Sequence, residues 1–156
     1  MGELRRSTDP RPQGFPKRIL VADDNPYFLP ALRFSLETHG YVVCGEAADG
    51  VAAIERAKEL KPDLVILDLV MPRLNGMETA AVLKNTMPRI PIVMLTFHED
   101  QITAVPASAF GIKAVIAKSD GIGKLIECLN GLFGPKEPRV DSASSGEKPS
   151  ANETAD

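Results

Sequence analysis

Cysteine, histidine and tryptophan are scarce in this chain of 156 residues, which has two cysteines, two histidines and no tryptophan. Cys44 and Cys128 lie far apart in the sequence and belong to no pairing motif, so we expect two reduced thiols. His39 and His98 are too isolated to supply the clustered ligands of a zinc site. These absences argue against a disulfide framework and against a zinc protein.

Long hydrophobic runs are also missing. No apolar segment approaches the roughly 18 residues that a membrane-spanning helix needs. The N-terminus, MGELRRSTDPRPQ, has no apolar segment after its charged residues and therefore does not resemble a secretory signal. We expect a cytoplasmic protein without a membrane span.

Basic residues form no stripe that would bind nucleic acid. Residues 19–134 contain ten basic and fourteen acidic side chains, and the whole chain has a net charge of −3. A nucleic-acid interface needs a positively charged surface, so we expect none in this chain. The short basic segment within residues 1–18 is more typical of a solvated tail.

The two ends of the chain differ in composition from its middle. Residues 1–16 contain three prolines and few apolar side chains, and residues 135–156 are rich in serine, proline and glutamate. Such segments bury too little apolar surface to become ordered, so we predict two disordered tails. The folded domain is then expected at residues 17–134.

Within this domain, short apolar runs alternate with segments of helical length. We predict five strands at the runs RILVA, YVVCGEA, DLVILDL, PIVMLTF and KAVIAK (18–22, 41–47, 63–69, 91–97 and 113–118). Four helical segments separate them, and a fifth, starting near Ile122, has apolar residues on a single face. Alternating strands and helices indicate an α/β fold with a parallel sheet covered on both faces, and the doubly wound strand order 2-1-3-4-5 fits five strands.

One acidic residue interrupts the most apolar of these runs. Seven of the eight residues from Leu64 to Met71 are apolar, and the exception is Asp68. In the predicted order, the ends of the first and third strands are neighbours, which brings Asp68 beside Asp23 and Asp24. Three carboxylates repel one another unless a cation neutralises them. Mg²⁺ suits such a site because it accepts carboxylate oxygens and shares its remaining positions with phosphate oxygens.

Two further polar residues are predicted at the same edge of the sheet. Thr96 lies at the end of the fourth strand and Lys118 at the end of the fifth. A hydroxyl, an ammonium and a metal ion around Asp68 form a set that suits a phosphoryl group. An aspartate in these surroundings can attack a phosphoryl donor and become an aspartyl phosphate.

The segments ILVADDNP, LVILDLVMPRLNG, VMLTFHED and VIAKSDG closely resemble the receiver domain of two-component response regulators. The resemblance covers about residues 18–134 and implies the flavodoxin-like fold. It implies that Asp68 is the phosphoacceptor and is phosphorylated by a sensor histidine kinase or a phosphotransfer domain. It also implies that Asp24, Asp68 and the backbone carbonyl of Val70 bind Mg²⁺ directly, with Asp23 acting through water. Lys118 would pair with the phosphoryl group, and Thr96 would move toward it.

Five positions depart from the usual family pattern. Val115 stands where many receivers have an aromatic residue that reports phosphorylation, and Ser119 stands where many have proline. Phe97 follows Thr96, at a position where receivers commonly have a small residue. We therefore expect Phe97 to change the lifetime of the acyl phosphate. Pro30 and Pro106 fall within the expected first and fourth helices, and we predict a short or mobile fourth helix because proline removes a backbone hydrogen bond.

The function expected from these features is that of a stand-alone receiver, a phosphorylation-dependent switch read by a partner protein. The alternative is a degenerate receiver that binds its partner without phosphorylation. An aspartate-based phosphatase is disfavoured because Val70 occupies the position where that chemistry needs a second acid. A flavin-binding module is disfavoured because DDNPYF, after the first strand, would repel a phosphate in the absence of a metal ion.

Overall fold

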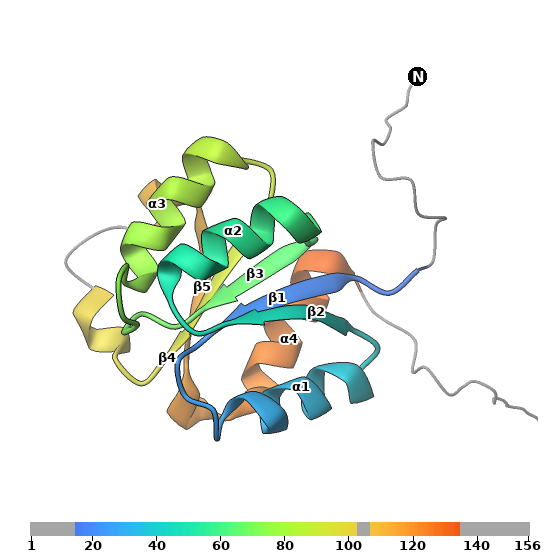
Figure 1. Cartoon of the computed structure of the whole chain (residues 1–156). Helices are drawn as coiled ribbons and strands as arrows, with labels where there is room; N and C mark the ends of the chain where they lie inside the picture. Colours follow the sequence, from blue (N-terminus) through green and yellow to red (C-terminus); the bar gives the residue numbers. More distant parts are fainter. Residues whose placement is uncertain (1–14, 103–106, 135–156) are drawn as a thin grey trace, which may run out of the picture.

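The computed structural model describes residues 15–102 and 107–134 as a parallel five-stranded sheet with helices on both faces (Figure 1). The strand order is β2-β1-β3-β4-β5, which confirms the predicted α/β class and the doubly wound topology. The strands are β1 (Arg18–Ala22), β2 (Val42–Ala47), β3 (Leu64–Leu67), β4 (Ile92–Thr96) and β5 (Ile112–Ala117). All four strand pairings are parallel.

In the described part of the chain, four α-helices cover the sheet: α1 (Leu29–Thr38), α2 (Gly50–Leu60), α3 (Gly76–Thr86) and α4 (Ile122–Phe133). Figure 1 shows α2 and α3 on one face of the sheet and α1 and α4 on the other. Successive strand residues point to opposite faces, so the strands contribute to two separate apolar cores. Leu20 and Leu67 lie in the core under α2 and α3, whereas Ile19 and Ile66 lie in the core under α1 and α4.

Local sequence explains where two of the helices begin. Asn75 caps α3: its side chain accepts a hydrogen bond from the backbone N–H of Glu78, and the Glu78 side chain accepts one from Asn75. The Asn75-Gly76 pair in the sequence predicts a turn that starts a helix at Met77, and α3 in fact starts at Gly76. Asn25-Pro26 in the sequence predicts the start of the first helix, yet α1 starts later, at Leu29. Pro30 lies in its first turn, where the missing N–H costs no helical hydrogen bond.

The connection between β4 and β5 differs from the expected helix. Among the described residues it contains two 3₁₀ helices, η2 (Glu99–Ile102) and η3 (Ala107–Phe110), and no α-helix. Another 3₁₀ helix, η4 (Lys118–Asp120), follows β5. Pro106, on which the prediction of a short or mobile helix rested, lies outside the described residues.

Strand β3 ends at Leu67 rather than at Leu69, so Asp68 follows the strand instead of lying within it. The predicted tails, residues 1–16 and 135–156, lie outside the described residues except for Phe15 and Pro16, and the 17–134 domain boundary stays a prediction. None of the helices in the described part of the chain is long and apolar enough to cross a membrane.

Candidate functional site

The carboxyl ends of four strands place the predicted site residues at one edge of the sheet. Asp23 directly follows β1, and Asp68 directly follows β3. Thr96 is the last residue of β4, and Lys118 directly follows β5. Because β1 and β3 pair in parallel with Ala22 opposite Leu67, the residues after both strands emerge side by side.

The three acidic residues form a compact cluster. One carboxylate oxygen from each of Asp23, Asp24 and Asp68 lies within 4.8 Å of the others. Asp23 and Asp68 are buried, with 3% and 7% of their surfaces exposed, whereas Asp24 is exposed. Carboxylate oxygens at this spacing, with one solvent-facing member, suit a hard divalent cation that retains some of its waters.

Lys118 supplies the counter-charge inside the cluster. Its Nζ donates to Asp23 Oδ2 at 2.5 Å and to Asp68 Oδ2 at 3.3 Å. The lysine side chain is only 2% exposed, so both contacts lie in a region of low dielectric constant. Burial raises the pKa of the Asp23 carboxyl above its ordinary value, while the hydrogen bonds from Lys118 and from the backbone of Asn25 oppose that rise.

One acceptor in this network lacks a partner. Asp68 Oδ1 is buried and accepts no hydrogen bond from any described residue. A buried carboxylate oxygen without a partner is costly, and functional sites are where such cost is usually found. The unpaired oxygen therefore fits a site whose ligand, a cation or a phosphoryl group, satisfies it.

The backbone around the cluster is held by specific hydrogen bonds. Asp23 N donates to Ala47 O and Asp68 N to Ala22 O, each at 2.9 Å, which extends the strand pairing by one residue. Gly76 N donates to Leu69 O at 2.7 Å and closes the loop that follows Asp68. A Cβ atom at Gly76 would collide with the carbonyl oxygen of Asp68, so glycine is needed for this close approach.

Thr96 and Val70 lie at the same edge without joining the ionic network. The Thr96 hydroxyl is fully buried and accepts a hydrogen bond from the backbone N–H of His98 at 3.0 Å. Val70 lies two residues after Asp68 with 46% of its surface exposed. The structure thus brings Asp23, Asp24, Asp68 and Lys118 into a cluster and places Thr96 and Val70 on its border.

Sequence reasoning missed one aromatic residue beside this cluster. The centroid of the Phe28 ring lies 4.3 Å from Lys118 Nζ. The Phe97 ring, which the sequence had singled out, lies 5.3 Å from the same atom and is 59% exposed. A phenylalanine just before an amphipathic helix is ordinarily assigned to the core, so the sequence held no signal for the Phe28 contact.

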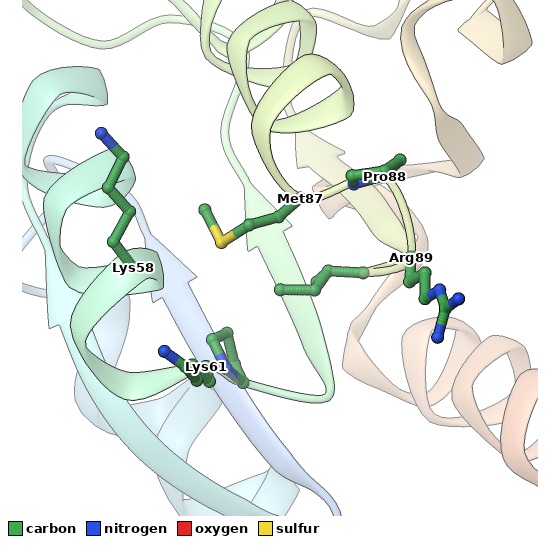
Figure 2. Close-up of a pocket in the computed structure, with 7 residues that line it drawn as sticks. Lys58, Lys61, Met87, Pro88 and Arg89 are labelled. Carbon is green, nitrogen blue, oxygen red and sulfur yellow. The ribbon is translucent and has the colours of Figure 1, made fainter. Parts of the chain in front are cut away.

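A pocket of about 520 Å³ lies at the opposite edge of the sheet, before β3 and β4 (Figure 2). Met87 and Ile90 contribute apolar surface, and Lys58, Lys61 and Arg89 contribute cationic side chains. Figure 2 shows the Lys58 and Arg89 side chains pointing away from each other rather than toward one ligand position. The lining contains no carboxylate, hydroxyl or thiol, so we place the candidate site at the acidic cluster.

Comparison with known proteins agrees with this assignment. The family model of the response regulator receiver domain matches residues 19–130. The chain belongs to the response regulator receiver domain family. A receiver domain is the part of a two-component signalling system that receives the signal, and it is a signalling module rather than a classical enzyme.

Several relatives are similar over most of this receiver domain. The chain is 33% identical to the chemotaxis protein CheY of Thermotoga maritima over 114 residues, which cover 73% of this chain and 95% of CheY. It is 37% identical to the transcriptional regulatory protein PdtaR of Mycobacterium tuberculosis over 115 residues, which cover 73% of this chain and 55% of PdtaR. The receiver therefore matches nearly all of one relative and about half of the other.

Solved structures share the fold. A LuxR-family response regulator from Aurantimonas superposes with a TM-score of 0.71 at 28% identity, covering 78% of this chain and 88% of that one. The response regulator TrrA of Thermotoga maritima, solved in complex with Mg²⁺ and BeF, superposes with a TM-score of 0.68 at 30% identity, covering 74% and 98%.

Proposed function

We propose that this receiver is switched by phosphorylation of Asp68. The observation that carries the proposal is the state of the Asp68 carboxylate, which is buried, faces Lys118 with Oδ2 and leaves Oδ1 without a partner. An acceptor of this kind is available to a phosphoryl donor while the cation beside it balances the added charge. The donor is a phosphohistidine of a sensor kinase or a phosphotransfer domain.

The transfer exchanges one bond to phosphorus for another. A carboxylate oxygen of Asp68 attacks phosphorus, the bond between phosphorus and the donor nitrogen breaks, and the histidine leaves with the electron pair of that bond. Lys118 pairs with the phosphoryl oxygens that now lie beside it. The Thr96 hydroxyl, which accepts from His98 N in this structure, turns to donate to a phosphoryl oxygen and carries the start of η2 with it.

The acidic cluster fits the Mg²⁺ that receiver chemistry uses. Asp24, Asp68 and the backbone carbonyl of Val70 would hold the ion directly, and Asp23 would hold it through water. When bound, Mg²⁺ neutralises negative charge on the phosphoryl oxygens. The partner that reads the phosphorylated state is a second protein in the cytoplasm.

Intact mass spectrometry tests the proposal directly. Wild type, Asp68→Asn and the exposed control Asp120→Asn are incubated with Mg²⁺ and acetyl phosphate. We expect wild type and Asp120→Asn to gain the mass of one phosphoryl group (about 80 Da) and Asp68→Asn to gain none. If folded wild type gains no mass, the proposal is wrong and the phosphorylation-independent interaction module becomes the function to pursue.

A further inference from the structure

The Lys118 ammonium lies between two carboxylates and two aromatic rings. Asp23 and Asp68 accept its hydrogen bonds, and the rings of Phe28 and Phe97 lie with their centroids 4.3 and 5.3 Å away. The rings come from different connections: Phe28 directly precedes α1 and Phe97 directly follows β4. The distances match those at which a ring attracts a cation, which is within about 6 Å of the centroid.

The two rings differ in how firmly they are held. Phe28 is half-buried and packs against the core under α1 and α4. Its backbone is fixed as well, because Phe28 N donates to Asn25 O at 3.2 Å and Phe28 O accepts from Leu32 N at 3.1 Å. Phe97 is 59% exposed. The Phe28 ring is therefore the fixed surface against which the ammonium rests.

We propose that Phe28 is a positioning residue for Lys118, a role that rests on the proposed phosphorylation of Asp68. A lysine side chain has four rotatable bonds, and holding its ammonium at one point costs conformational entropy. The Phe28 ring offsets this cost by attracting the cation and by excluding water from one side of it. The ammonium is then within hydrogen-bonding distance of Asp68 before the phosphoryl group arrives, so it need not be recruited from solvent.

The test separates the effect of the aromatic ring of Phe28 from the effect of its side-chain volume. Phe28→Leu keeps an apolar side chain of similar size but removes the aromatic face, whereas Phe28→Tyr keeps the ring. Phe34→Leu is the matched control, because Phe34 lies on α1 with 73% of its surface exposed. Two quantities are measured on the full chain: the rate of phosphorylation by acetyl phosphate with Mg²⁺, and the proton chemical shift of the Lys118 ε-methylene group.

We expect Phe28→Leu to be phosphorylated about three- to tenfold more slowly, while Phe28→Tyr and Phe34→Leu stay near the wild-type rate. The ε-methylene protons resonate upfield in wild type because of the ring current, keep that shift in Phe28→Tyr and lose it in Phe28→Leu. A wild-type rate in Phe28→Leu, an equally slow Phe28→Tyr, or an unchanged ε-methylene shift in Phe28→Leu overturns the proposal.

Failure of the phosphorylation proposal gives a different result. In that case wild type gains no phosphoryl group, yet its ε-methylene shift, recorded without any phosphodonor, still reports whether the Phe28 ring holds Lys118. A shift that disappears in Phe28→Leu and persists in Phe28→Tyr then supports the positioning contact by itself.

Discussion

Lys118 Nζ lies 2.5 Å from Asp23 Oδ2, so residues 95 positions apart in the sequence form a buried ion pair at the edge of the sheet. The lysine is closer to Asp23 than to the proposed phosphoacceptor, Asp68, at 3.3 Å. The Lys118 ammonium thus pairs with two carboxylates, and the cluster of three carboxylates keeps an excess of negative charge. We expect this imbalance to favour the binding of a cation and to lower the stability of the fold.

The charge imbalance predicts that Asp68→Asn is more stable than wild type when divalent cations are removed by EDTA. The substitution removes one of three mutually repelling charges while keeping the size and shape of the side chain. We expect the free energy of unfolding in urea to rise by about 1 kcal/mol. Added Mg²⁺ should stabilise wild type and have less effect on Asp68→Asn, because binding to the folded state is linked to its stability.

The exposed control Asp120→Asn should behave like wild type in both conditions. A loss of stability in Asp68→Asn measured in EDTA would contradict the inference that the cluster carries more negative charge than Lys118 neutralises.

Phe97 is predicted to restrict access of water to the phosphorylated site. Its exposed ring lies 5.3 Å from Lys118 Nζ, at the mouth of the cluster. We expect Phe97→Ala to shorten the lifetime of the acyl phosphate severalfold, measured as loss of phosphoryl mass after the phosphodonor is removed. Phe34→Ala, which removes an exposed ring on α1, is the control. An unchanged dephosphorylation rate in Phe97→Ala means that the ring only packs against the site.

The cap of α3 is predicted to contribute measurably to stability. Asn75→Ala removes the side chain that accepts from Glu78 N at 2.8 Å, and we expect a loss of about 1 kcal/mol in urea unfolding. Asn75→Asp should retain most of that stability because aspartate is an equally good cap. Asn85→Ala, on an exposed position in the last turn of the same helix, should not destabilise. Equal stability of Asn75→Ala and Asn75→Asp would show that the cap contributes little.

The raised pKa of Tyr41 predicts that the free energy of unfolding falls in alkaline solution. Burial raises the pKa of Tyr41 to about 12 from an ordinary 10.0, and its hydroxyl donates to Asn130 Oδ1 at 2.7 Å. Between these pH values the unfolded chain loses the phenolic proton while the folded chain keeps it. The free energy of unfolding should therefore decline from pH 10 to pH 12 by up to about 2 kcal/mol. Below pH 10 the stabilisation by the protonated Tyr41 is fully present.

Tyr41→Phe should flatten this decline, although the lost hydrogen bond costs some stability at neutral pH. Tyr27→Phe is the matched control, because Tyr27 is 90% exposed and should leave the slope unchanged. Identical slopes in wild type and Tyr41→Phe between pH 10 and pH 12 would refute the assignment.

Much of the fold and of the acidic site was predictable from local pattern. Apolar runs located the strands, parallel topology brought their ends together, and Asn75-Gly76 marked the start of α3 to within one residue. The detail of the β4–β5 connection was not predictable, since the sequence indicated only a short or mobile helix there and its described residues form two 3₁₀ helices. Nor was the Phe28 contact, because the distance from a ring to an ammonium depends on how α1 packs against the sheet.

The two connections beside Asp68 differ in their backbone hydrogen bonding. On the β3–α3 side, α3 begins with a capping box next to the Asp68 carbonyl, and even a methyl group at Gly76 has no room there. On the β4–β5 side, the described backbone consists of 3₁₀ turns, whose hydrogen bonds have poorer geometry than those of an α-helix. A change of charge at Asp68 should therefore displace η2 more readily than α3. A partner that contacts η2 would then meet a surface that differs more between the unphosphorylated and the phosphorylated domain.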